Sequence, residues 1–178
     1  MTEAQLKAAP WRDKATWGEG PWQTEPDRVD FIAHGFACLA LRHPDRGHFC
    51  GYVGVPEGHP RYGGDCDVMT DLEFHGGINY TAACEEGGLI CHAPAPGMPD
   101  KVWWIGGDFG HVWDKCPGRD AFARFVAAEN RARGWIASAE LLEREPRQPL
   151  PAIYRPLPYV RAEITALAAQ LAAMEPHA

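Results

Sequence analysis

Apolar residues occur in short runs along the first two thirds of the chain. Runs at residues 36–41 and 49–55 flank a polar turn at residues 43–47. Short apolar runs bounded by turn residues are typical of β-strands, and two such runs around one turn predict a β-hairpin. Further strands are predicted at residues 68–74, 78–83, 89–92 and 102–106, between glycine-rich and proline-rich turns. Together these segments predict one largely antiparallel sheet.

The pattern changes to a helical period after residue 118. Residues 119–133 carry alanines with Phe122, Phe125 and Val126 at helical spacing. A second helix is predicted at residues 137–145, and a third begins at Pro158, where the first turn tolerates proline.

The third predicted helix has a single apolar face. Its apolar residues recur in steps of four and three, at Val160, Ile164, Leu167, Leu171 and Met174. Such a stripe fits either docking of the helix on the open face of the sheet or a seam between copies in a homo-oligomer.

Residues 1–29 differ from the rest of the chain and predict an extended polar arm with three prolines and three tryptophans. Tryptophans so close together indicate that the arm packs against another part of the chain. We therefore predict an α+β fold in a single domain with three parts: the arm at 1–29, sheet and loops at 30–116, and helices at 117–178.

Composition narrows the classes of function. The chain has 46% hydrophobic and 23% charged residues, which places it among globular proteins. A net charge of -7 argues against broad nucleic-acid binding, which requires a basic surface. Neither a signal peptide nor a long apolar segment is evident, so we expect a cytoplasmic protein without a membrane span. In a reducing compartment, most of the six cysteines are expected to be thiols that serve as small buried hydrophobes.

The residues that suit chemistry are concentrated between His48 and Cys116. In this region Asp108, His111 and Asp114 form a D-x-x-H-x-x-D pattern, which a turn could aim at one point. With His75, which precedes two glycines, they would form a shell of two imidazoles and two carboxylates for zinc, manganese or iron. His75 and His111 are then also the candidate catalytic residues.

Other interpretations of these residues remain open. Asp108 could cap a turn or orient His111, and His75 could satisfy a buried carbonyl group. A second set of possible metal ligands consists of Cys84, Cys91, His92 and Cys116. Cys84 or Cys91 could also act as a nucleophile with a histidine base, whereas Ser138, the only serine, lies in a helical stretch without a nucleophile-elbow pattern.

A third interpretation is a nucleotide pocket. Glycine pairs let the backbone approach a ligand, and tryptophans can stack on a base. The candidate ligand-binding residues are His59, Tyr62, His75, Gly76, Gly77, Tyr80, Trp104, Asp108, His111 and Asp114. The glycines could equally serve only as turn residues, with the tryptophans in the core.

Five segments are distinctive as sequence words: GPWQTEPDRVDF (20–31), CGYVGVPEGHPRYG (50–63), FHGGINYTAAC (74–84), WWIGGDFGHVWD (103–114) and YVRAEITALAAQLAA (159–173). Through these segments, most of the chain resembles a family of small uncharacterised proteins from phages and prophage-bearing bacteria. In that family the tryptophan pair is followed by G-F-D-C-A-H and a further acid. Asp108, His111 and Asp114 match that pattern, whereas Gly107, Phe109 and Gly110 replace its phenylalanine, cysteine and alanine.

The resemblance implies a phage or prophage setting, where small proteins capture or destroy nucleotide immune signals. Three hypotheses follow. The leading one is a small-molecule binding protein for a nucleotide-like ligand, in a homo-oligomer formed through the C-terminal helix. The second is a metal-dependent hydrolase acting on a phosphodiester or an amide. The third is a protein-interaction module.

Overall fold

The computed structural model describes residues 9–84, 88–91, 99, 101–144 and 151–174. The chain divides into two compact units that interleave along the sequence. The helical unit comprises Met1–Glu25, His43–His48 and Gly110–Arg155, and the sheet unit comprises Pro26–Arg42, Phe49–Phe109 and Pro156–Ala178. These boundaries differ from the three consecutive parts predicted from the sequence.

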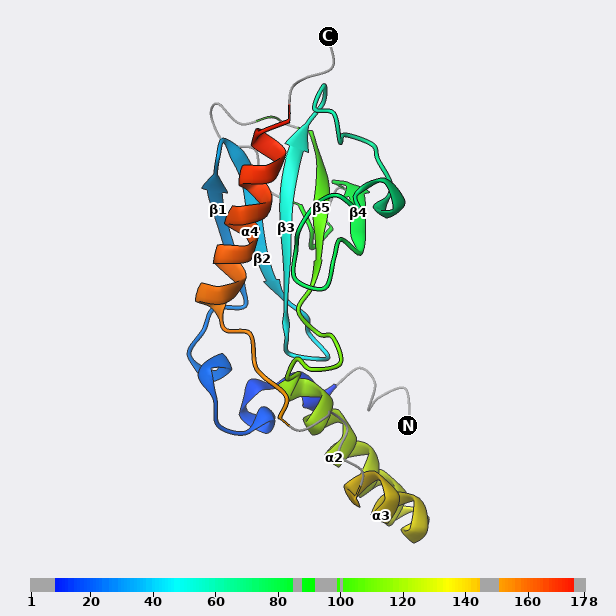
Figure 1. Ribbon diagram of the computed structural model, residues 1–178. Helices are drawn as coiled ribbons and strands as arrows, with labels where there is room; N and C mark the ends of the chain where they lie inside the picture. Colours follow the sequence, from blue (N-terminus) through cyan, green and yellow to red (C-terminus); the bar gives the residue numbers. More distant parts are fainter. Residues whose placement is uncertain (1–8, 85–87, 92–98, 100, 145–150, 175–178) are drawn as a thin grey trace. The chain divides into compact units, whose positions relative to one another are not determined.

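Among its described residues, the sheet unit contains five antiparallel strands in the order β1-β2-β3-β5-β4 (Figure 1). The strands are β1 (Arg28–Ala33), β2 (Phe36–Arg42), β3 (Phe49–Pro56), β4 (Tyr80–Ala83) and β5 (Val102–Asp108). The turn between β1 and β2 consists of His34 and Gly35, both with positive φ angles of 50° and 83°. Two residues in that conformation are typical of the tight turns that match the twist of a hairpin.

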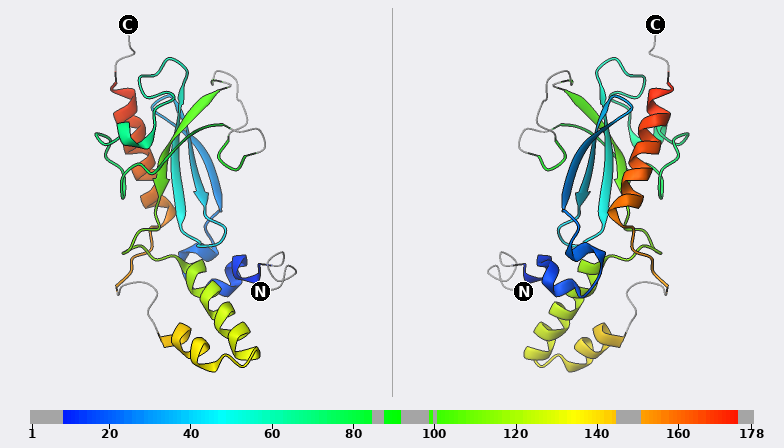
Figure 2. Two further views of the ribbon diagram at one scale, coloured as in Figure 1. Left: turned by 90° about the vertical axis from the view of Figure 1, so that its right-hand side faces the viewer. Right: turned by 90° about the vertical axis from the view of Figure 1, so that its left-hand side faces the viewer.

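Helix α4 (Leu157–Ala172) covers one face of this sheet, as both views of Figure 2 show. Val160, Ile164, Leu167 and Leu171 have no exposed surface and belong to the same core cluster as residues of β2 and β3. The predicted docking of the apolar stripe on the sheet is therefore confirmed. An oligomer formed through the C-terminal helix stays a prediction.

Close packing of β5 against β3 requires a glycine at one position of β5. A Cβ atom added to Gly106 would lie 1.9 Å from the carbonyl oxygen of Gly51 in β3. No side chain fits at such a distance, so a glycine is required here by the neighbouring strand, without any ligand.

A second apolar cluster lies on the other face of the sheet, with Trp104 and Leu39 fully buried in it. Cys84 and Cys91 form a disulfide at this face. The guanidinium of Arg28 donates hydrogen bonds to the carbonyl oxygens of Leu89 and Cys91, and thereby holds the disulfide segment beside β1.

The described part of the helical unit contains two α-helices and three short 3-10 helices. Helices α2 (Pro117–Ala132) and α3 (Ile136–Arg144) pack against each other, and η1 (Pro10–Arg12), η2 (Lys14–Trp17) and η3 (Pro21–Gln23) precede them in the sequence. Trp11, Trp17 and Trp22 are buried in one cluster with Ala121 of α2. The predicted packing of the tryptophans is confirmed. However, the arm is not extended, because its described part turns through three 3-10 helices before β1.

The α+β class with a mostly antiparallel sheet is confirmed, as are the hairpin, the strands near residues 80 and 102, and the three helices. Two predicted strands are wrong. The segment predicted as a strand at residues 68–74 begins with the last residue of the 3-10 helix η4 (Cys66–Val68) and continues as turns and bends. Residues 89 and 90 form a bend, Cys91 has irregular backbone, and His92 lies outside the described residues.

Apolar and polar residues alternate at 68–74, which is why a strand was predicted there. The structure shows the physical reason for this wrong prediction. Met69, Leu72 and Phe74 are buried in the α4 side of the core, although their backbone pairs with no strand. Irregular backbone can therefore present apolar side chains to a core at spacings that imitate a strand. Within the described part of the chain, no helix has the length and apolar character that crossing a membrane requires.

Candidate functional site

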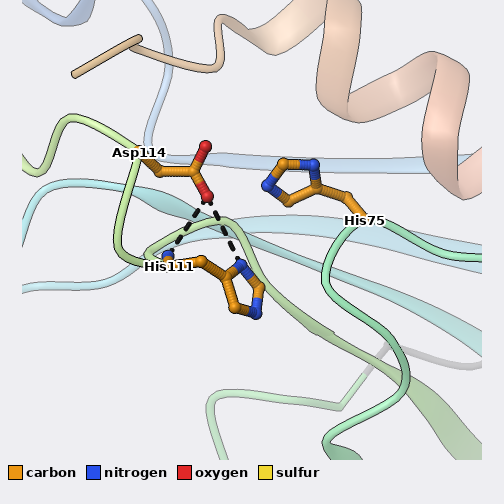
Figure 3. A group of neighbouring side chains, drawn as sticks. All are labelled: His75, His111 and Asp114. Carbon is orange, nitrogen blue, oxygen red and sulfur yellow. Dashed lines mark hydrogen bonds and ion pairs between the residues drawn. The ribbon is translucent and has the colours of Figure 1, made fainter. Parts of the chain in front are cut away.

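His111 and Asp114 form a close pair in the helical unit, on the loop between β5 and α2. The Asp114 side chain is 2% exposed, and its Oδ2 atom lies 3.3 Å from Nδ1 of His111. The same oxygen accepts a hydrogen bond of 3.1 Å from the backbone N–H of His111. Figure 3 marks both interactions with dashed lines. The sequence therefore predicted correctly that a turn brings this imidazole and this carboxylate together.

Arg155 holds the other oxygen of Asp114. Its Nε atom donates a hydrogen bond of 2.7 Å to Oδ1, and the Arg155 side chain is 24% exposed. A β-bridge between Asp114 and Ile153 fixes the two segments beside each other. A buried carboxylate requires such a partner because desolvation of an unpaired charge costs several kcal/mol. Sequence analysis missed Arg155, since nothing in its local pattern points to a residue 41 positions away.

His75 lies in the sheet unit, on a turn that follows residues 69–74. Its Nδ1 atom is 3.2 Å from the hydroxyl oxygen of Tyr159, and its backbone N–H donates to Oε2 of Glu163 at 3.1 Å. The ring of Phe109 stacks on the imidazole, with centroids 5.0 Å apart and an interplanar angle of 11°. Helix α4 and the end of β5 therefore fix both the position and the orientation of His75.

The fourth predicted ligand, Asp108, ends strand β5. Its Oδ2 atom accepts a hydrogen bond of 2.8 Å from Nδ2 of Asn79. This contact gives Asp108 a role in joining β5 to the loop before β4. Its participation in a metal site stays a prediction.

His75, His111 and Asp114 suit a metal ion chemically, because each offers one ligand atom, an imidazole nitrogen or a carboxylate oxygen. His75 is described within the sheet unit, and the other two residues within the helical unit. Their convergence on one cavity stays a prediction.

The structure gives most residues of the predicted nucleotide pocket a role in packing or turns. Trp104 is fully buried, Tyr80 packs edge-on against Tyr52, and Tyr62 packs beside Trp103. His59 contacts the carbonyl oxygen of Leu171 at 3.0 Å and accepts a hydrogen bond from the backbone of Arg61.

Two glycines of that pocket have backbone conformations that explain their identity. Gly76 and Gly77 have φ angles of 71° and 86°, which glycine adopts without strain. The turn after His75 therefore requires glycines whether or not a ligand binds. Nucleotide binding stays a prediction.

The cysteines differ in part from the expectation. Cys84 and Cys91 are joined in a disulfide, so in this state neither is a thiolate nucleophile or a zinc ligand. The other four remain thiols, and Cys38, Cys50 and Cys116 are buried, as expected for small hydrophobes. Burial raises the pKa of the Cys38 thiol to about 12, which keeps it protonated at neutral pH.

Sequence analysis also missed a buried contact in the helical unit. The Sγ atom of Cys116 lies 3.4 Å from Nδ1 of His48, and both side chains are buried. A Cβ atom at Gly110 would lie 2.7 Å from the His48 ring, so Gly110 makes room for that ring. Gly110 thus has a packing role.

Comparison of the chain with protein-family models, with curated proteins and with solved structures found no match. The resemblance to phage and prophage proteins stays a prediction, and the arguments for function rest on the residues themselves.

Proposed function

We propose that this chain is a metal-dependent hydrolase that binds a divalent cation, zinc or manganese, through His75, His111 and Asp114. The observation that carries the proposal is the His111–Asp114 pair, in which a buried carboxylate oxygen lies 3.3 Å from an imidazole nitrogen. Figure 3 draws the three side chains of the proposed set.

The types of ligand support a catalytic role. His75, His111 and Asp114 would hold the ion with two imidazoles and one carboxylate, a set of protein ligands typical of catalytic zinc sites. When bound, the ion would supply an activated water for hydrolysis of a phosphodiester or an amide.

Covalent geometry supports the inclusion of His75. Phe109 stacks on His75 within the sheet unit, and His111 follows Phe109 by two residues. Because two residues span at most about 7 Å, we include His75 in the proposed set through its contact with Phe109.

The partners of Asp114 support it as well. Arg155 occupies Oδ1, and the turn of His111 orients Oδ2. A carboxylate oxygen accepts more than one contact, so Oδ2 can bind a cation while the backbone N–H continues to hold it. Partners of this kind orient ligands and strengthen metal binding.

The first test is metal content. Protein purified without a histidine tag, and without added chelator, is expected to contain about one zinc or manganese ion per chain by elemental analysis. The metal-stripped chain is expected to take up zinc in a calorimetric titration. Metal-free protein that takes up neither ion would remove the proposal.

Variants locate the site within the chain. His75→Asn and His111→Asn are each expected to weaken zinc binding by about 100-fold or more, since each removes one of three ligands. The matched control is His34→Asn, because His34 is exposed in the β1–β2 turn and asparagine tolerates its positive φ angle. Equal affinity in all three variants would show that zinc binds elsewhere.

The reaction class requires a separate assay. Hydrolysis of bis(p-nitrophenyl) phosphate and of a p-nitroanilide is expected to depend on the added cation and to be lost in His111→Asn. A chain that binds zinc but hydrolyses neither substrate would keep the metal site and contradict the hydrolase.

A further inference from the structure

Helix α4 presents two polar residues to the turn that carries His75. Tyr159 and Glu163 are four residues apart, so they lie one turn apart on the same side of the helix. Tyr159 contacts the ring of His75, and Glu163 accepts the hydrogen bond from its backbone N–H. The helix thus holds His75 at two independent points.

The ring of His75 is also confined by aromatic neighbours. Phe109 stacks on it almost in parallel, at 11°, and Tyr159 meets it edge-on, at 89°. These contacts restrict rotation of the imidazole about its side-chain bonds. The nitrogen that faces the Tyr159 hydroxyl, at 3.2 Å, is Nδ1.

We infer that Tyr159 is a positioning residue for the metal site and sets the tautomer of His75. In this arrangement Nδ1–H donates a hydrogen bond to the Tyr159 oxygen, and Nε2, without a proton, binds the cation. The inference rests on the proposed metal-dependent function and adds a residue 84 positions away from the histidine that it controls.

The physical basis is that a neutral imidazole carries its proton on one nitrogen only. The hydrogen bond made by one nitrogen decides which nitrogen remains for a metal ion. Metal-binding histidines commonly donate their other N–H to an oxygen, and loss of that partner typically weakens metal binding by about 10-fold to 100-fold.

The tautomer can be measured without any metal. In the metal-stripped chain at about pH 8, nitrogen-15 NMR of the imidazoles is expected to show the His75 proton on Nδ1. His75→Gln assigns the signal. In Tyr159→Phe, which removes only the hydroxyl group, the preference for Nδ1–H is expected to be lost. A proton on Nε2 in the unaltered chain would overturn the inference.

Zinc affinity provides the second measurement. Tyr159→Phe is expected to bind zinc about 10-fold more weakly than the unaltered chain. The matched control is Tyr154→Phe, because Tyr154 is also half-buried and its hydroxyl donates a hydrogen bond to Glu25 in the helical unit. This control is expected to leave zinc affinity and the His75 signal unchanged.

The outcomes separate the inference from the proposed function. If the unaltered chain binds zinc but Tyr159→Phe binds it equally well, the inference fails and the metal site stands. If the unaltered chain binds no zinc, the proposed function is wrong, and the inference about Tyr159 as a positioning residue for the metal site is wrong as well. Circular dichroism of each variant excludes misfolding as the cause of weaker binding.

Discussion

Asp114 illustrates how one buried carboxylate can have two purposes. Its oxygens hold the turn of His111 and the side chain of Arg155, so it stabilises the fold of the helical unit whether or not a metal ion binds. Its 2% exposure makes it one of the few buried charged residues in the described part of the chain. Both purposes require the same negative charge.

Asp114→Asn is expected to lower the free energy of unfolding by about 1–3 kcal/mol, since it keeps the size of the side chain and removes its charge. The estimate is below that for a fully buried pair because solvent still reaches Arg155. Urea denaturation of the metal-stripped chain measures the change.

Asp67→Asn serves as the control for this prediction, because Asp67 is exposed in the 3-10 helix η4. It is expected to change stability by no more than about 0.5 kcal/mol. Similar stability of the two variants would contradict a structural role for Asp114.

Among the elements, α4 combines structural and site-building positions. Its apolar stripe covers the sheet, while Tyr159 and Glu163 hold the His75 turn. Because both sets of contacts depend on one rigid helix, a shift of α4 on the sheet would also displace His75.

Ile164→Ala tests the packing of α4. Ile164 has no exposed surface and lies over Gly51, where even one added methyl group would be only 2.7 Å away. Its truncation leaves a cavity that the sheet cannot fill, and the expected loss of stability is about 2–5 kcal/mol by chemical denaturation.

Ile136→Ala is the comparison for that substitution, since Ile136 is 45% exposed at the start of α3. Its expected cost is below about 1 kcal/mol, because little apolar surface is lost from a core. Equal costs at the two positions would show that α4 does not pack tightly on the sheet.

Elements with a strong period could be predicted from the sequence. The apolar stripe of α4 and the two apolar runs of the β2–β3 hairpin are each buried in the structure. Their patterns of apolar residues therefore predicted a helix and two strands correctly. Strand β1 was missed because it begins within the polar arm, where the charged residues Arg28 and Asp30 interrupt its apolar residues.

The candidate site could be predicted only where its residues are close in the sequence. The spacing of His111 and Asp114 predicted their contact, because a turn joins residues three apart. The contacts of His75 with Tyr159 and of Asp114 with Arg155 arise from the tertiary fold, and no periodic pattern encodes them.

At the scale of the whole molecule, the chain passes repeatedly between the two units. Segments of the helical unit alternate with segments of the sheet unit, and α4 lies in the last of these segments. Neither unit is therefore encoded by one continuous stretch of sequence, and a single cut leaves at least one of them incomplete.

A chain shortened to residues 1–155 retains every segment of the helical unit and all five strands but lacks α4. The apolar face beneath α4 would then contact water, so the shortened chain is expected to bind 8-anilinonaphthalene-1-sulfonate strongly and to aggregate. Fluorescence of the dye and light scattering measure this.

Addition of a synthetic peptide of residues 156–178 is expected to reduce the dye signal, because the peptide supplies the α4 segment that covers the exposed apolar face of the sheet. A scrambled peptide of the same composition is the control. A shortened chain that binds no dye and unfolds like the full chain would show that α4 is dispensable for the sheet.

The late position of α4 also has a consequence during synthesis. A ribosome makes all five strands, and then both helices of the α2–α3 pair, before it reaches residue 157. Until then the nascent sheet lacks the helix that shields one of its faces, and at ordinary elongation rates this interval lasts for seconds. In that interval the growing polypeptide is a natural client for chaperones that bind exposed hydrophobic segments.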